Sequence, residues 1–436
     1  MFEQENKIII VDDIPGHLDT LSKPFYDNGI GCKCFNYDVN YNTPLKNVRV
    51  AFFDIRINPT GGGSEGQRLN DIATAIKQYI HVDNGPFALI FWTSNKSEIE
   101  AIKKYIHERH NDCPKPFLVD FIDKDEFLDN PDKLTSKLEE VLGDETLKIL
   151  FEFERVSSQS ASMTINQLYE IIPRNDTWGE TENFKENFEK VFSKIAVQNS
   201  GYNYAKHNPD KGVVLSLLPI LNHHIENMHD SEKWKNYLTT ITNSTSYSKV
   251  TYPDDFNEGK LNSIFHIKKT NGDKEVRGTV IELDKGNQII LNSLNISKID
   301  DWFNNLIPFN KDKDEIKKQM RSDSKLIAVE ISAACDFSNN KKRINKYALG
   351  FITPLINFKE DINDEIRIES SYHVGCANFN FDGKDFQIWL NLNFVIGTKP
   401  DDPRLGAARF VLKKEIMDMI GNKYASHVSR IGITSF

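Results

Sequence analysis

The chain has 436 residues, which at roughly 150 residues per domain predicts about three structural units. Apolar residues make up 39% and charged residues 27%, close to ordinary globular usage, so extended disorder, collagen and coiled-coil rods are excluded. Lys and Arg number 54 against 63 Asp and Glu, a formal net charge of −9, so we do not expect nucleic acid as a partner.

The first third of the chain alternates short apolar runs with amphipathic stretches, a pattern typical of βαβ units that form a parallel sheet. The expected strands are residues 7–11, 48–53, 87–92 and 117–122, and the expected helices are residues 17–28, 66–81, 96–108 and 131–142. We therefore predict an α/β domain over residues 1–145.

The rest of the chain predicts two further segments. Residues 146–245 carry helical periodicity and form an expected helical connector or bundle. Residues 246–436 predict a mostly β (α+β) domain with turns at 271–272 and 382–383 and a final helix at about 403–419. Its expected strands are residues 264–268, 278–282, 288–291, 326–331, 347–352 and 386–394.

Polar residues follow all four N-terminal strands, where an open α/β sheet binds its ligands. They are Asp12 and Asp13, Asp54, Thr93 with Ser94, and Lys124. Three clustered carboxylates repel one another unless a hard cation such as Mg²⁺ lies between them. An aspartate can also act as a nucleophile and form an acyl phosphate, with a hydroxyl and an ammonium group contacting the phosphoryl oxygens.

The four strand ends resemble the four signatures of the response-regulator receiver domain over about the first 145 residues. The matching segments are KIIIVDD at 7–13, FFD at 52–54, IFWTS at 90–94 and FIDK at 121–124. The resemblance implies a flavodoxin-like, doubly wound parallel sheet.

The resemblance also implies a role for each residue and a Mg²⁺ cofactor. Asp54 is the expected phosphoacceptor, and Asp12 and Asp13 are the expected acidic metal pair. The remaining expected roles fall on Thr93 as the switch hydroxyl, on Lys124 as the phosphate-contacting lysine, and on the main-chain carbonyl of Arg56 as a metal ligand. One departure is Asp125, which stands where the family usually has proline.

The chain looks closer to the divergent receiver-like domains of bacterial multidomain proteins, some of them encoded in candidate antiphage operons, than to a typical transcriptional response regulator. We therefore expect a two-component signalling protein that forms a homo- or hetero-oligomer. Its expected partner is a histidine kinase or a GHKL-type ATPase. Phosphorylation at Asp54 would control the C-terminal domain, which would act as an effector or interaction module.

Two alternatives stay open at this point. A degenerate receiver could serve only as the docking module of a scaffold subunit in a larger complex. The C-terminal domain could instead be an enzyme, because Cys335 and Asp336 follow an expected strand and His373 lies downstream, so that a thiol nucleophile and a base could meet.

Cysteine and histidine are spaced too thinly for a disulfide or zinc framework. The five cysteines are an odd number, which suits a reducing compartment. His107 and His110 could share one helix face, but no third ligand lies near them in the sequence. The first seven residues lack the pattern of a signal peptide, and no apolar run reaches the roughly 20 residues that span a bilayer. We therefore expect a cytoplasmic protein without a membrane partner.

Overall fold

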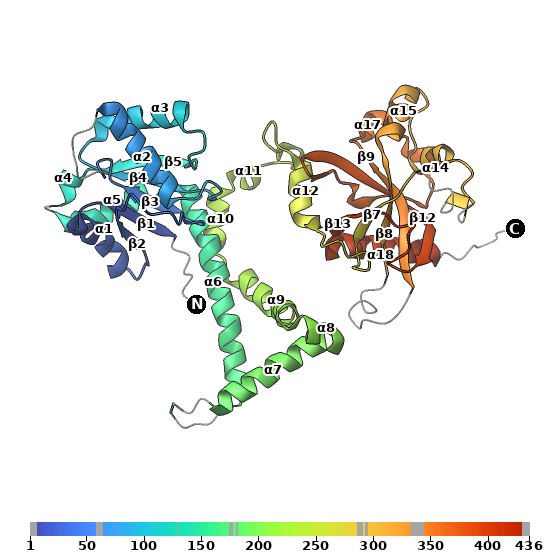
Figure 1. Ribbon diagram of the computed structural model, residues 1–436, viewed down its shortest axis with the longest axis horizontal. Coiled ribbons are helices and arrows are strands. Elements are labelled where there is room, and N and C mark those ends of the chain that lie inside the picture. Colours follow the sequence, from blue (N-terminus) through green and yellow to red (C-terminus); the bar gives the residue numbers. More distant parts are fainter. Residues whose placement is uncertain are drawn as a thin grey trace. The chain divides into compact units, whose positions relative to one another are not determined.

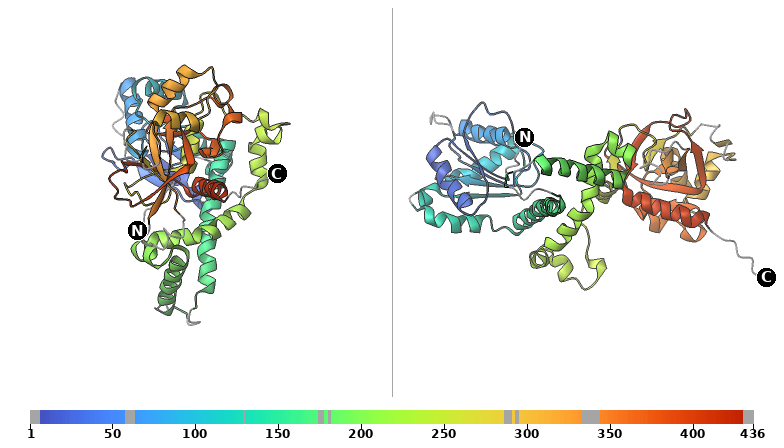
Figure 2. Two further views of the ribbon diagram at one scale, coloured as in Figure 1. Left: turned by 90° about the vertical axis from the view of Figure 1, so that its right-hand side faces the viewer. Right: turned by 90° about the horizontal axis from the view of Figure 1, so that it is seen from below.

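The structure is a computed structural model that describes residues 7–57, 64–128, 130–173, 178–179, 182–285, 291–292, 295–332 and 344–429. The chain divides into two compact units (Figures 1 and 2). The first comprises residues 1–165 and 221–250, and the second comprises residues 166–220 and 251–436. The helical segment between the two sheets therefore contributes residues to both units.

The first unit contains a five-stranded parallel sheet in the order β2-β1-β3-β4-β5. This is the flavodoxin-like order, and it confirms the predicted doubly wound sheet. The strands are β1 (Ile8–Asp12), β2 (Lys33–Asn36), β3 (Val50–Phe53), β4 (Ala88–Trp92) and β5 (Leu118–Ile122). The sequence prediction missed β2, a four-residue edge strand that is only half buried and therefore carries no continuous apolar run.

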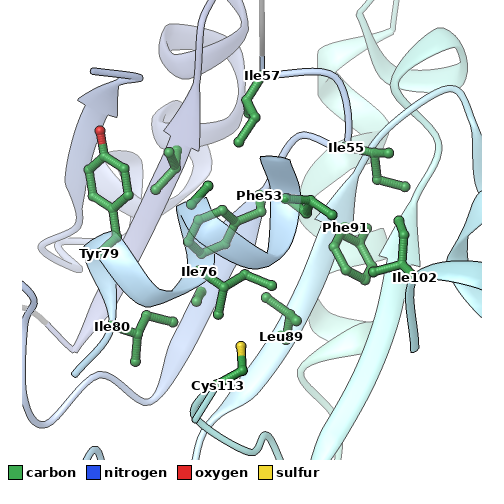
Figure 3. Packing of buried hydrophobic residues seen from close by; sticks show 14 of the residues in the cluster. Phe53, Ile55, Ile57, Ile76, Tyr79, Ile80, Leu89, Phe91, Ile102 and Cys113 are labelled. Carbon is green, nitrogen blue, oxygen red and sulfur yellow. The ribbon is translucent and has the colours of Figure 1, made fainter. Parts of the chain in front are cut away.

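Helices cover both faces of this sheet, which explains why β1, β3 and β4 are buried throughout. On one face lie α1 (Pro15–Asp27) and α5 (Leu134–Val141), with the short α4 (Lys124–Phe127) after β5. On the other face, α2 (Glu65–Tyr79) and α3 (Ile99–Arg109) pack on alternate residues of the same strands (Figure 3). All four helices predicted from the sequence are confirmed within a few residues.

The segment between β2 and β3 contains no helix. Tyr37 and Tyr41 instead pack against Tyr79 of α2, and the rings of Tyr41 and Tyr79 stack with centroids 4.5 Å apart. The hydroxyl of Tyr79 also accepts a hydrogen bond from the backbone N–H of Asp38 at 2.9 Å. An aromatic cluster thus covers the part of the sheet beside the edge strand.

The expected helical region is confirmed. Its helices are α6 (Glu145–Ile171), α7 (Glu182–Ser200), α8 (Tyr202–His207), α9 (Pro209–Met228), α10 (Ser231–Tyr237) and α11 (Thr239–Thr242). In the part of the chain that the structure describes, no helix combines the length and the hydropathy needed to cross a bilayer.

The second unit contains an eight-stranded antiparallel sheet in the order β10-β12-β9-β8-β7-β13-β6, with β11 paired to β12. The strands are β6 (Ile267–Lys269), β7 (Thr279–Glu282), β8 (Lys325–Glu330), β9 (Asn345–Thr353), β10 (Ser371–His373), β11 (Phe379–Phe381), β12 (Lys384–Thr398) and β13 (Ala408–Leu412). Its helices include α12 (Glu258–His266), α14 (Ile299–Leu306), α15 (Asp314–Asp323), α17 (Phe358–Asp361) and α18 (Lys414–Val428). Asp382 and Gly383 both have positive φ and form the predicted tight turn between β11 and β12.

Two element predictions in this unit are wrong. The expected strand 264–268 begins only at Ile267, because α12 continues through His266. The expected helix 403–419 is interrupted by β13, because its apolar run Phe410–Leu412 is buried between β6 and β7, and a short buried run has no periodicity that separates strand from helix. Residues 288–290 of the expected strand 288–291 lie outside the described residues.

Candidate functional site

The carboxyl ends of four parallel strands meet at one edge of the N-terminal sheet. The register pairs Val11 with Phe53, Phe53 with Phe91, and Phe91 with Phe121, so the strand ends lie level with one another. Each strand then delivers one predicted polar group to this edge: Asp12 ends β1, Asp54 follows β3, Thr93 follows β4, and Lys124 begins α4 after β5.

Lys124 lies between two of the carboxylates. Its Nζ is 2.6 Å from Oδ2 of Asp12 and 2.8 Å from Oδ2 of Asp54. The three side chains are 5%, 0% and 9% exposed, so water screens these charges weakly. The lysine therefore neutralises one of the buried negative charges and holds the ends of β1, β3 and β5 together.

Asp13 completes an acidic cluster. One carboxylate oxygen from each of Asp12, Asp13 and Asp54 lies within 4.8 Å of the others. Oδ1 of Asp13 is buried and accepts no hydrogen bond from the residues that the structure describes. Burial, and then the charge of neighbouring Asp12, raise the pKa of Asp13 above its ordinary value.

These residues fit a hard divalent cation such as Mg²⁺. Within the described part of the chain, three carboxylates face the ammonium group of Lys124, and one of their buried oxygens has no hydrogen-bond partner. Carboxylate oxygens are the ligands that Mg²⁺ prefers, and a cation beside Asp13 would stabilise its ionised form against both burial and the charge of Asp12, which together raise its pKa.

His17 is a member of this site that the sequence reasoning missed. It lies in the first turn of α1, with its Nδ1 3.1 Å from Nζ of Lys124 and 3.3 Å from Oδ1 of Asp12. The signal was available in the sequence, because the first turn of a helix that follows β1 must begin at the same edge of the sheet as Asp12. His17 thus connects the first turn of α1 with Lys124 and Asp12.

Thr93 and Ser94 form the wall of the site at the end of β4. Thr93 is fully buried, and its Oγ1 accepts a hydrogen bond from the backbone N–H of Asn95 at 3.1 Å. The hydroxyl of Ser94 donates to Oδ1 of Asp125 at 2.6 Å. Asp125, the residue after Lys124, therefore connects the start of α4 with the end of β4.

Arg56 lies two residues beyond Asp54, and its side chain is exposed. Its guanidinium pairs with Glu98 at 3.4 Å, and Glu98 also approaches Nε of Arg68 in α2 at 3.6 Å. This surface network connects the segment after β3 with the turn that precedes α3. The role of the Arg56 carbonyl as a metal ligand stays a prediction.

The candidate residues of the C-terminal domain are described only in part. Cys335 and Asp336 lie outside the described residues. His373 is at the end of β10, buried, and stacked on Trp389 with ring centroids 4.7 Å apart. Burial lowers the pKa of His373 to about 4, so its imidazole is neutral at pH 7 and packs as part of the core.

Asp13→Asn should stabilise the first unit at pH 7 in a chelating buffer, by roughly 0.5 kcal/mol because solvent screens this partly exposed group. A raised carboxyl pKa weakens the native state as the pH rises above the ordinary value of 3.8, so the gain should vanish below that pH. Hydrogen exchange of β1 and β3 amides, measured with and without Mg²⁺, checks this. Mg²⁺ should stabilise the unchanged protein more than the variant. If Asp13→Asn were less stable than the unchanged protein at pH 7 without metal, and Mg²⁺ stabilised both proteins equally, Asp13 would not belong to a cation site.

Comparison of the chain with protein-family models, with curated proteins and with solved structures gave no match. The likeness to receiver domains is therefore carried by the strand order β2-β1-β3-β4-β5 and by the buried acidic cluster at its carboxyl edge.

Proposed function

We propose that the first unit is a receiver-like phosphoacceptor module of a cytoplasmic signalling protein, modified at Asp54 in a Mg²⁺-dependent reaction. The observation that supports this most is the arrangement of Lys124 between Asp12 and Asp54, beside the unpaired carboxylate oxygen of Asp13. Structural ion pairs do not require a third, uncompensated carboxylate at the same edge, whereas a cation-dependent phosphoryl-transfer site does.

The reaction follows from the groups at the site. A carboxylate oxygen of Asp54 attacks the phosphorus atom of the donor, a P–O bond to Asp54 forms, and the bond to the leaving group breaks with its electron pair on the leaving group. Bound Mg²⁺ would offset the charge on the phosphoryl oxygens. The ammonium group of Lys124, already 2.8 Å from Asp54, would pair with one of those oxygens.

Phosphorylation would act as a switch because it changes the charge and size of the group that Lys124 binds. An added phosphoryl group brings extra negative charge and strong hydrogen-bond acceptors to Asp54. The Thr93 hydroxyl, buried at the end of β4, is the group we propose to reorient toward them. Thr93 precedes the turn Lys96–Glu98 and α3, which would carry the change to the surface of the unit.

The proposed partner is a histidine kinase or a GHKL-type ATPase, and the second unit is the proposed effector or interaction module, with antiphage defence as the proposed setting. One observation favours a second candidate, a docking module without phosphotransfer. Lys124 contacts Asp12 and Asp54 directly, so it can hold this edge of the sheet together without phosphorylation.

Intact-mass measurement after incubation with Mg²⁺ and acetyl phosphate separates the two candidates. We expect one added phosphoryl group, no adduct when a chelator replaces Mg²⁺, and none with Asp54→Asn. The matched control Asp83→Asn, an exposed aspartate in the same unit, should behave like the unchanged protein. No adduct with acetyl phosphate, phosphoramidate or a cognate kinase would leave docking as the function.

A further inference from the structure

A second site in the first unit lies away from the acidic edge of the sheet. A cavity of about 360 Å³ lies between α3 and strands β4 and β5, on the face of the sheet that also carries α2. It is lined by Leu89 near the start of β4, by Val119 near the start of β5, and by the segment that precedes β5. Apart from Phe91, its lining from β4, β5 and the segment before β5 lies toward the amino-terminal ends of these strands, and its volume is in the range of small-molecule sites.

The floor of the cavity is apolar and tightly packed. Leu89 and Phe91 of β4 and Ile102 of α3 are almost fully buried there (Figure 3). Cys113, also labelled in Figure 3, forms part of the wall. Burial raises the pKa of its thiol to about 11, so Cys113 is neutral at pH 7 and contributes an uncharged surface. An apolar ring or branched chain is the kind of group that this floor can accommodate.

Among the described residues that line the cavity, the ionisable side chains other than Cys113 are basic, and Glu100, which pairs with Lys103, lies outside the lining. Lys103 and Lys115 line it together with His107 and His110, and none of its lining residues is Asp or Glu. The chain as a whole has more acidic residues, 63, than Lys and Arg, 54, so a lining without carboxylates departs from the average surface. The rim therefore favours an anionic group.

Two prolines restrict the backbone of the segment that carries Lys115. Pro114 and Pro116 flank Lys115, and each fixes its own φ and restricts the residue before it. The prolines therefore fix the backbone on both sides of Lys115. Lys103 pairs with Glu100 at 2.8 Å, but the two side chains are 42% and 84% exposed and such a pair contributes little, so the Lys103 ammonium group can turn to an anion.

We propose that this cavity binds a small organic anion with an aromatic or branched apolar body, whose anionic group lies at Lys103 and Lys115 and whose body lies on Leu89, Phe91 and Ile102. The proposal is independent of phosphorylation at Asp54. It predicts that the charge of the ligand, and not only its apolar area, determines affinity.

Two probes with the same aromatic body separate these contributions. 8-Anilinonaphthalene-1-sulfonate carries a sulfonate, and N-phenyl-1-naphthylamine lacks it. We expect the sulfonate to bind more tightly in a fluorescence titration of the full chain. The double variant Lys103→Glu with Lys115→Glu should weaken sulfonate binding about tenfold and leave the neutral probe unchanged. Lys104→Glu is the matched control, because Lys104 is the next residue of α3, is 76% exposed and does not line the cavity.

Protection of Cys113 from alkylation shows whether the probe binds in the cavity, and it needs no variant that could misfold. Bound sulfonate probe should slow the reaction of Cys113 with iodoacetamide, read by peptide mass spectrometry, and should not slow that of Cys34, which packs against the opposite face of the sheet. Equal affinity for the two probes, unchanged sulfonate binding by the double variant, or unprotected Cys113 would each overturn the proposal. Competition by a second copy of the chain would point to a protein contact at this cavity and would overturn it as well.

Discussion

Lys124→Met should destabilise the first unit by about 3–5 kcal/mol in metal-free buffer, because it leaves two buried carboxylates without the charge that compensates them. Asp12 and Asp54 are both within 2.8 Å of Nζ in the native structure. Methionine preserves most of the apolar stem of lysine, so the loss reports mainly on the ammonium group. Millimolar Mg²⁺ should restore part of the stability, since a cation at the cluster would take over the neutralising role.

Denaturant-dependent hydrogen exchange of β1 and β3 amides measures this loss in the first unit alone. The control is Lys23→Met, which removes an ion pair with Asp27 on α1. The side chains of Lys23 and Asp27 are 67% and 58% exposed. Such a pair contributes roughly 0.2–1 kcal/mol. If both lysine variants lowered the free energy of unfolding of the first unit by the same small amount, Lys124 would not be the group that compensates Asp12 and Asp54.

Gly350→Ala should cost about 3 kcal/mol or more in the second unit. Gly350 is buried in β9 and pairs with Leu390 of β12. A Cβ atom at this position would overlap the main-chain carbonyl oxygen of Trp389, so the two central strands would have to separate. Backbone atoms cannot turn away as a side chain can, and the strain would therefore disrupt the β9–β12 pairing.

The free energy of unfolding of the second unit, followed by hydrogen exchange of β9 and β12 amides, tests this expectation. Gly421→Ala is the control in the same unit, because the new Cβ would meet only the flexible end of Arg277 at 3.3 Å and the φ of Gly421 is not in the left-handed region. It should not destabilise the second unit, since alanine favours a helix over glycine by about 1 kcal/mol. Similar small effects of the two variants would mean that β9 and β12 do not approach as closely as described.

The N-terminal site could be predicted because β1, β3 and β4 are buried apolar runs that end at or just before a polar residue, and the less buried β5 is followed directly by Asp123 and Lys124. Asp12, Asp54, Thr93 and Lys124 all mark such boundaries, and parallel strands bring those boundaries to one edge. His17 was missed because the prediction considered only the residues that directly follow the strands, and His17 lies one helical turn further on, in the first turn of α1.

The second unit was less predictable because its sheet joins strands that are distant in sequence. β13 pairs with both β6 and β7, more than 120 residues earlier in the chain. No local pattern in residues 408–412 specifies those partners, and the same buried apolar run suits a helix equally well. The tight turn at Asp382 and Gly383 was predictable, since it depends only on two adjacent residues that tolerate positive φ.

The most direct test of the phosphoacceptor assignment is to trap the acyl phosphate chemically. Borohydride reduces an aspartyl phosphate to homoserine, and peptide mass spectrometry then locates the modified position. After treatment with acetyl phosphate and Mg²⁺, the account predicts homoserine at position 54 alone, with none in the sample that contains a chelator. Homoserine at another aspartate, or at none while a cognate kinase is present, would contradict it.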